Sequence, residues 1–168
     1  YSTNIDCLNE PLEVYGRVIP NRLGILPLEG FDSEPDGSPS EYVYRRYLRF
    51  VEGGAGLVWF EACAVSEDGK SNPAQMMIHK GNVDAFKELI ATMDSKAEKS
   101  GRKKSFKVLQ LTHSGRMSKN EKWDAIPLSP KRYGDDDNAE YATDQRILKI
   151  VNEKDLIEEK LKNLFIFL

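Results

Sequence analysis

The chain has few of the residues that disulfide frameworks and metal sites require. Its 168 residues include two cysteines, Cys7 and Cys63, and two histidines, His79 and His113. The cysteines lie far apart in no recognisable motif, which excludes a disulfide-rich secreted scaffold and favours a reducing, cytoplasmic compartment. The histidines lie in different loops and lack the spacing of a zinc site, so we expect no metal.

Long apolar runs and a strong charge of either sign are also missing. No apolar stretch approaches the roughly 20 residues of a membrane span, so we expect no membrane partner. The formal net charge of −3 argues against nucleic acid as a partner. The basic run 102–104 and the acidic run 135–138 are interpreted as solvated turns, since the acidic run lacks the ligand spacing of a calcium loop.

The length allows one domain but is short for a complete β/α barrel, which typically needs about 250 residues. The sequence starts at Tyr1 and finishes on the apolar run 164–168. We interpret that run as an interrupted element, and the chain as part of a larger protein.

Three short apolar runs that end in small or polar residues predict strands. They cover residues 23–28, 57–60 and 106–111. The second run is uninterrupted, which is typical of a strand buried on both faces in a parallel sheet. In a parallel barrel, the chemistry is carried where such strands end.

Two amphipathic helices are predicted between these strands. For the first, Ser38 is the expected cap, Pro39 the first helical residue and Glu41 the end of a capping box. Glycines 53–54 close it. Its apolar face is expected opposite three arginines: Arg45, Arg46 and Arg49. The second helix is expected to start at Asn82, with a buried stripe of Val83, Phe86, Leu89, Ile90, Met93 and Ala97.

This alternation predicts an α/β fold with right-handed parallel connections. We expect a partial (β/α)8 TIM barrel covering about the first three β/α units. Residues 1–168 then form the N-terminal part of a single domain. Within it, 129–168 is a polar loop followed by one broken helix or two.

Polar residues follow the third strand, and each has two interpretations. Gln110 either points into the barrel mouth, where its amide can bind a ligand, or is a strand-end residue satisfied by a loop. His113 is more often a hydrogen-bonded loop residue than a catalyst. Arg116 suits a phosphate or carboxylate, or equally a structural ion pair. Glycines 53–56 precede a strand, so a dinucleotide-binding fingerprint is excluded.

The stretch Gln110-Leu111-Thr112-His113-Ser114-Gly115-Arg116, together with 21–30 and 53–62, resembles the N-terminal part of the Old Yellow Enzyme family of FMN-dependent oxidoreductases. The resemblance spans roughly residues 12–128. It implies bound FMN, NAD(P)H as reductant and hydride transfer to an activated alkene or enoate as the small-molecule substrate. No cysteine cluster for an iron–sulfur centre is present, so the resemblance allows one only further along.

The resemblance also implies roles for individual residues. Gln110 binds the pyrimidine edge of FMN. Ala62 is the small residue that lets the flavin approach closely. Thr112 shapes the substrate side of the pocket, and its modest size implies a roomy pocket.

The end of the first strand, Pro27, Leu28 and Glu29, lines the isoalloxazine ring by the same resemblance. Glu29 departs from the family, in which Thr or Cys is common at this position. A carboxylate there is expected to disfavour the negatively charged reduced flavin and to lower its potential.

A larger departure concerns the fourth strand. The family's His-x-x-Asn or His-x-x-His pair, its proton-donating Tyr and its phosphate site have no counterpart here. We therefore assign no catalytic residue, expect the chain to diverge inside the helix before that strand, and expect it to be inactive alone.

Two alternatives stay open. The chain could be a non-catalytic partial barrel that binds a partner, or a β/α barrel with unrelated chemistry, since the fold does not fix function. A homo-oligomer is also compatible with the sequence.

Overall fold

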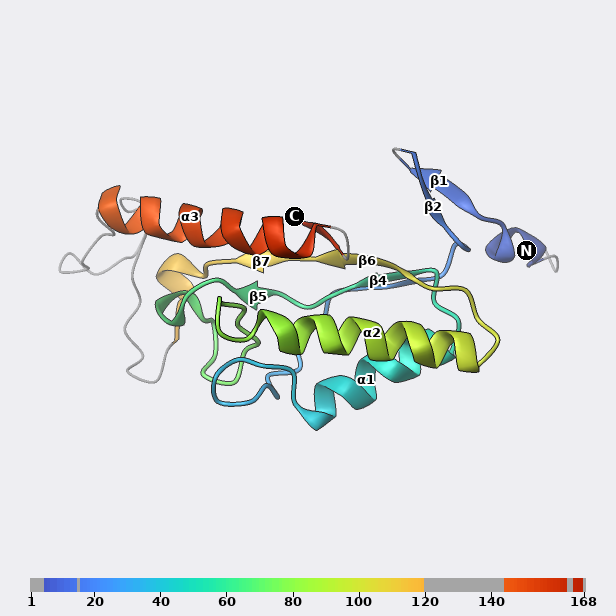
Figure 1. The fold of residues 1–168 in the computed structure, drawn as a ribbon, viewed down its shortest axis with the longest axis horizontal. Helices are drawn as coiled ribbons and strands as arrows, with labels where there is room; N and C mark the ends of the chain where they lie inside the picture. The colour runs from blue at the N-terminus through green and yellow to red at the C-terminus, as the bar shows by residue number, and fades with distance from the viewer. Residues whose placement is uncertain (1–4, 15, 120–143, 163–164, 168) are drawn as a thin grey trace.

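The computed structural model describes residues 5–14, 16–119, 144–162 and 165–167. The polar loop predicted after residue 129 lies outside these ranges up to residue 143. The described residues form a layer of parallel strands and three helices (Figure 1).

A sheet of four parallel strands is the centre of the fold. Its order is β3 (Gly24–Ile25), β4 (Leu57–Trp59), β6 (Phe106–Leu109) and β8 (Ile166–Phe167). Beyond β4 and β6 the same two segments pair again, as β5 (Cys63–Ala64) and β7 (Leu111–Thr112). The α/β class and the parallel arrangement of the three predicted strands are therefore confirmed.

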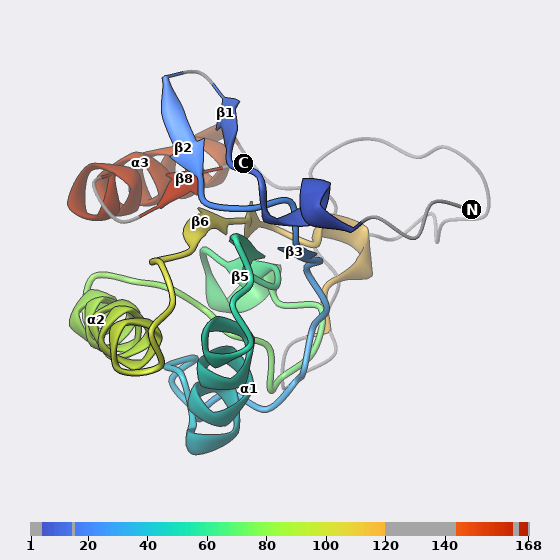
Figure 2. The same cartoon turned by 90° about the vertical axis from the view of Figure 1, so that its right-hand side faces the viewer.

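Three helices follow one another around one side of the curved sheet (Figure 2). They are α1 (Glu41–Glu52), α2 (Val83–Lys99) and α3 (Asp144–Leu161). The strands alternate between this helix face and the opposite face. In β6, for example, Lys107 reaches α2 through an ion pair of 2.6 Å with Asp94, and Leu109 lies in the core. Phe106 and Val108 accordingly point to the opposite face, which no described helix covers.

The first helix begins later than the sequence analysis expects. Ser40, and not Ser38, is the N-cap, because the Ser40 hydroxyl accepts a hydrogen bond from the backbone N–H of Val43. The hydroxyl of Ser38 bonds instead to Asp36 in the preceding turn. Pro39 thus lies before the cap, outside the helix. At the other end Gly54 adopts a positive φ of 86°, as the predicted glycine stop requires.

The core lies between the helices and the strands. The complete predicted stripe of α2, from Val83 to Ala97, is buried. From α1, Tyr47 stacks on Phe60 with ring centroids 4.2 Å apart. Phe165 meets the other side of Phe60 edge-on at 5.1 Å. One aromatic cluster therefore joins α1, the end of β4 and the segment before β8.

The C-terminal part corrects two expectations. Residues 144–161 form one unbroken helix, and not two. After it, Ile166 and Phe167 pair in parallel with Val108 and Leu109. The expectation that no strand follows this helix is therefore wrong. The apolar run misled it, because five apolar residues without polar alternation fit a short buried strand as well as a helix.

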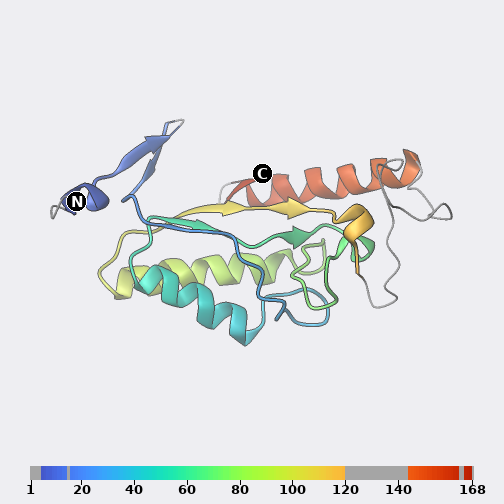
Figure 3. The ribbon, with the colours of Figure 1, turned by 180° about the vertical axis from the view of Figure 1, so that it is seen from behind.

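The N-terminal residues form a short 3-10 helix η1 (Asp6–Asn9) and a hairpin of β1 (Leu12–Val14) and β2 (Arg17–Ile19). The hairpin lies at the end of the molecule where the parallel strands begin (Figure 3). It is therefore far from the ends of the strands, where the predicted site residues lie. Within the described part of the chain, no helix has both the length and the apolar character to cross a membrane.

Candidate functional site

Five of the six predicted site residues lie one to four residues after the first, second or third parallel strand, and the sixth ends β7. Since β3, β4 and β6 run in the same direction, these residues meet at one edge of the sheet, at the left in Figure 1. They are Pro27, Leu28, Glu29, Ala62, Gln110 and Thr112. The structure thus brings together residues that lie up to 85 positions apart, from 27 to 112 in the sequence.

A one-residue bulge shapes this edge. The N–H of Phe60 donates to the carbonyl of Val108 at 2.8 Å, and the N–H of Cys63 donates to the carbonyl of Gln110 at 2.9 Å. Between these two hydrogen bonds, the segment after β4 advances by three residues, whereas the neighbouring segment advances by two. The extra residue lets both Phe60 and Glu61 face the helices, so Ala62 points to the opposite face.

On the helix face, Glu61 is the centre of a buried ionic cluster. Arg46 of α1 donates to Glu61 at 2.7 Å and to both oxygens of Asp32 at 2.6 and 2.9 Å. The other oxygen of Glu61 accepts the backbone N–H of Gly30 at 2.8 Å. The arginine approaches Gly30 so closely that a Cβ there would lie 2.5 Å from its guanidinium. The cluster therefore fixes the loop after β3 to the end of β4.

Tyr47 completes the cluster from one helical position further along. Its hydroxyl accepts the backbone N–H of Glu61 at 3.0 Å and lies 3.3 Å from the Glu61 carboxylate. The hydrogen bonds to Arg46 lower the pKa of Asp32. Burial, and then the charge of Glu61, raise the pKa of Tyr47 well above its usual range. The tyrosine therefore stays neutral and acts as a hydrogen-bonding group.

On the opposite face, Gln110 is less satisfied. It is half-buried, and it follows Leu109, which faces the core. Among the described residues its side-chain amide has no hydrogen-bond partner, while its backbone carbonyl accepts from Cys63. Within the described ranges no loop residue bonds to the amide, and both interpretations of Gln110 stay open. A planar amide with two donors and one acceptor remains available to a ligand.

The loop after β3 presents both an apolar and an acidic group. The side chain of Leu28 is 82% exposed. Glu29 is half-buried, and its carboxylate accepts a hydrogen bond of 2.5 Å from the amide of Gln75. Burial, the largest influence, raises the pKa of Glu29, and the nearby charge of Glu61 adds to this.

The residues after the third strand differ in their surroundings. Thr112 pairs with Ala64 at the edge of the site. The ring of His113 accepts the N–H of Gly115 at 3.0 Å, and its other nitrogen is 3.5 Å from Asp68. This supports the loop-residue interpretation of His113. The side chain of Arg116 lies outside the described part.

Sequence reasoning missed Arg46 and Gln75. Arg46 was expected on the solvent face of α1, yet it is half-buried and bonded to two carboxylates. A single arginine between two exposed ones carries no signal of this. Gln75 lies in an irregular loop, where only its position two residues after Asn72-Pro73 could have suggested a structured turn.

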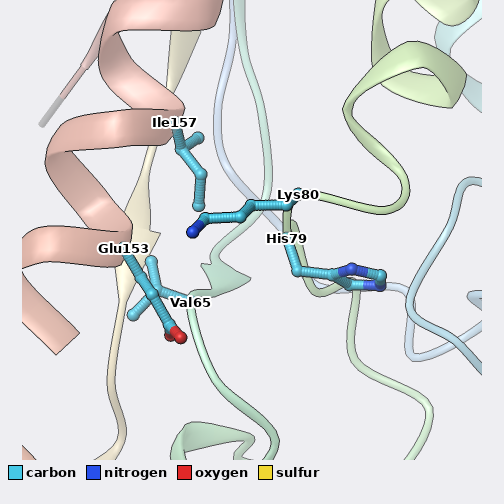
Figure 4. A pocket seen from close by; sticks show the side chains of 5 residues that line it. All are labelled: Val65, His79, Lys80, Glu153 and Ile157. Carbon is cyan, nitrogen blue, oxygen red and sulfur yellow. The ribbon is translucent and has the colours of Figure 1, made fainter. Parts of the chain in front are cut away.

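A separate cavity lies between α3 and the segment before α2, and Figure 4 shows its lining. Its volume is about 200 Å³, and it is lined by Val65, His79, Lys80, Glu153 and Ile157. The ring of His79 points away from α3 and is bonded to its own loop, where it accepts the N–H of Gly81. None of the predicted site residues lines this cavity, so it does not extend the candidate site.

Metal ligands do not cluster in the described ranges, where no group of three or more His, Cys, Asp or Glu side chains could hold an ion. The predicted site residues at the ends of the strands offer amide, carboxylate and apolar groups to a ligand.

Curated proteins with similar sequences include NADPH dehydrogenases. The one from Listeria welshimeri is 30% identical over 100 residues, which are 58% of this chain and 28% of the relative. The one from Bacillus pumilus is 28% identical over 112 residues, which are 66% of this chain and 31% of the relative. The matched part of the chain thus spans less than a third of these relatives. No protein-family model matches the chain.

Solved structures with a similar fold include an Old Yellow Enzyme and a morphinone reductase. An Old Yellow Enzyme from Pichia sp. AKU4542 superimposes with a TM-score of 0.75 at 16% identity, over 94% of this chain and 43% of that one. Morphinone reductase gives a TM-score of 0.69 at 18% identity, over 95% of this chain and 46% of that one. At such identities the likeness concerns the fold. Together with the sequence relatives, it confirms the predicted resemblance to the N-terminal part of the Old Yellow Enzyme family.

Proposed function

Because both the sequence and the fold of this chain resemble the Old Yellow Enzyme family, we propose that it is the FMN-holding part of an oxidoreductase of that type. In this proposal the flavin ring lies on the open face of the sheet, at the ends of β3, β4 and β6. FMN supplies hydride transfer when bound, and the protein supplies binding, orientation and electrostatics.

The observation that carries the proposal is the unpartnered amide of Gln110. Solvent reaches this half-buried amide, and a ligand edge that both donates and accepts would take the place of that water at its donors and acceptor. The pyrimidine edge of a flavin has such groups. This supports Gln110 as a binding residue, over a purely structural role.

The neighbouring groups suit a flat aromatic ligand. The bulge directs Ala62 to the open face, where its single methyl group leaves room for a ring. Pro27 and Leu28 form an exposed apolar border, and a bound ring would cover the side chain of Leu28, which is 82% exposed. In this arrangement Gln110 orients the ring, and the apolar border excludes water from one side of it.

We further propose that NAD(P)H is the reductant and that an activated alkene or enoate is the substrate, with Thr112 on the substrate side. The similarity to NADPH dehydrogenases supports the first part. A structural neighbour, a morphinone reductase variant, was solved in complex with tetrahydroNAD. Groups that polarise a substrate carbonyl or deliver a proton are not assigned among the described residues, so we propose that the 168-residue chain is inactive alone.

A binding experiment tests the flavin site. The purified chain is mixed with FMN, and the dissociation constant is measured from the quenching of flavin fluorescence. A Gln110→Met variant keeps the length of the side chain but removes its donors and acceptor. Since each lost hydrogen bond costs about 1 kcal/mol, we expect affinity to fall at least about tenfold.

Gln145 provides the matched control, because it is an exposed glutamine of α3 that is not among the predicted site residues. Gln145→Met should bind FMN like the parent. Equal affinities of the parent and Gln110→Met would exclude the proposed role of Gln110. If the folded parent does not bind FMN, the proposed function itself fails for this chain.

A second candidate is a non-catalytic partial barrel that binds a partner chain. It is favoured by the open outer edges of β3 and β8 in the described sheet and by the exposed side chains of Leu26 and Leu28. A colourless protein that is monodisperse only with a partner would support this candidate. A yellow protein that retains FMN through gel filtration would support the flavin site.

We propose the cytoplasm as the compartment. Both cysteines are free thiols, with Cys7 exposed and Cys63 buried. An exposed free thiol is typical of proteins in a reducing environment.

A further inference from the structure

The side chain of Gln75 connects two of the proposed flavin-site residues. It is 1% exposed. Its amide nitrogen donates to the carboxylate of Glu29 at 2.5 Å and to the backbone carbonyl of Ala62 at 3.0 Å. It thus spans from the loop after β3 to the bulge after β4.

The surroundings fix which way the amide points. Its oxygen accepts the backbone N–H of Ser71 at 2.7 Å, so its nitrogen must face the two oxygen acceptors. Both donors and one acceptor position are therefore used. Glutamate would place a second carboxylate against Glu29, and an apolar residue would leave both acceptors unpaired. Glutamine is the side chain that satisfies all three partners at once.

The groups that surround Glu29 are otherwise unfavourable to its charge. Burial and the charge of Glu61 raise the pKa of Glu29, whereas the hydrogen bonds from Gln75 and from the hydroxyl of Ser71 lower it. The Ser71 hydroxyl is the more distant donor, at 3.5 Å. The thiol of Cys63 is neutral, because burial raises its pKa well above the usual range. Gln75 is therefore the main support for an ionised Glu29.

We propose that Gln75 is a positioning residue, which holds the Glu29 carboxylate in its charged form beside Ala62 at the edge of the flavin site. The inference rests on the proposed function as far as the flavin is concerned. The contact between Gln75 and Glu29 itself does not depend on FMN. In the proposed site the fixed charge of Glu29 opposes the negative charge that FMN gains on reduction.

The first test uses the protein without FMN. The ionisation of Glu29 is followed by NMR of its side-chain carboxyl carbon, identified with a Glu29→Gln variant. Removing a charge-assisted hydrogen bond should lower the acid dissociation constant of Glu29 about tenfold in Gln75→Met. Ser71→Ala is the matched control, and its effect should be several-fold smaller. An unchanged dissociation constant in a folded Gln75→Met would overturn the proposal.

A second variant keeps the test possible if the first variant does not fold. If Gln75→Met does not fold, Gln75→His is used, since a ring nitrogen can still donate one bond. An intermediate shift of Glu29 would support the positioning role, and none would overturn it.

The last test uses the FMN-loaded chain. Glu29→Gln should raise the midpoint potential of FMN, and Gln75→Met should raise it toward the same value at pH 6. In the Glu29→Gln background, Gln75→Met should change nothing further, because its effect passes through Glu29. Additive changes would overturn the proposal. If FMN does not bind, the proposed function fails, while the NMR result still decides the role of Gln75.

Discussion

The two faces of the sheet, at the edge where the strands end, differ in how completely their polar groups are paired. On the helix face, Glu61 is 1% exposed, and its carboxylate bonds to Arg46, Tyr47 and the N–H of Gly30. On the open face, the amide of Gln110 lacks a described partner, and Leu28 projects into solvent. The carboxylate of Glu61 is fully paired within the protein, although the buried Nε of Arg46 has no hydrogen-bond partner among the described residues, whereas the amide of Gln110 has free binding capacity.

This difference separates residues that hold the fold from residues that can hold a ligand. Buried polar groups in a protein are nearly always hydrogen-bonded, so a paired cluster needs no ligand to explain it. Substitutions on the helix face should therefore reduce stability most. Those on the open face should reduce stability little and affect ligand binding instead.

The largest effect is expected from Arg46→Met. It leaves the buried charge of Glu61 without its cation, and breaking a buried ion pair from one side typically costs about 3–5 kcal/mol. Because Arg46 is partly exposed, with a side chain 25% accessible, we expect the lower part of that range. The measurement is the free energy of unfolding in urea.

Arg49→Met is the control for this substitution. Arg49 lies on the same helix but is exposed, and its guanidinium forms no ion pair within the described residues. Its loss should change the unfolding free energy by less than about 0.5 kcal/mol. Equal effects of the two substitutions would show that the ionic cluster does not stabilise the fold.

A smaller effect is expected from Tyr47→Phe. The ring and its stacking on Phe60 remain, but the buried N–H of Glu61 loses its acceptor. An unsatisfied buried donor costs about 1–3 kcal/mol. Urea denaturation of Tyr47→Phe beside Tyr42→Phe, an exposed tyrosine of the same helix, measures this cost. A loss no greater than that of Tyr42→Phe would contradict the assigned hydrogen bond.

The smallest effect on stability is expected from Leu28→Ser on the open face. Its side chain is already 82% exposed, so little apolar burial is lost. We expect the melting temperature to stay within about 2 °C of the parent, which a thermal scan would detect. A clear loss of stability would mean that Leu28 is packed in solution, and the contrast between the faces would no longer hold.

Much of the fold could be predicted from the sequence, because the spacing of apolar residues indicates which side chains are buried and glycines mark where helices end. The stripe of α2 and the glycine stop of α1 are of this kind. The meeting of Ala62 and Gln110 at one edge followed from the parallel order of the strands. The Ser40 cap was missed because Ser38-Pro39 offered an equally good local signal two residues earlier.

The remaining features depend on contacts between distant residues. Arg46 bonds to Glu61, which is 15 positions away, and Gln75 bonds to Glu29, which is 46 positions away. No local pattern marks such partners. The fourth strand was missed for a related reason, since Ile166 and Phe167 become a strand only beside β6.

The bulge at the end of β4 changes which residues of the strand face the helices. Before it, the even-numbered residues Val58 and Phe60 face the helices; after it, the odd-numbered Glu61 and Cys63 do. The position of the bulge therefore decides which side chains are buried under the helices and which face the open side, where a ligand can bind. If the same residues continued the strand without the bulge, Cys63 would face the open side and Ala64 the helices. The small side chain of Ala62 thus borders the proposed ligand site only because the bulge precedes it.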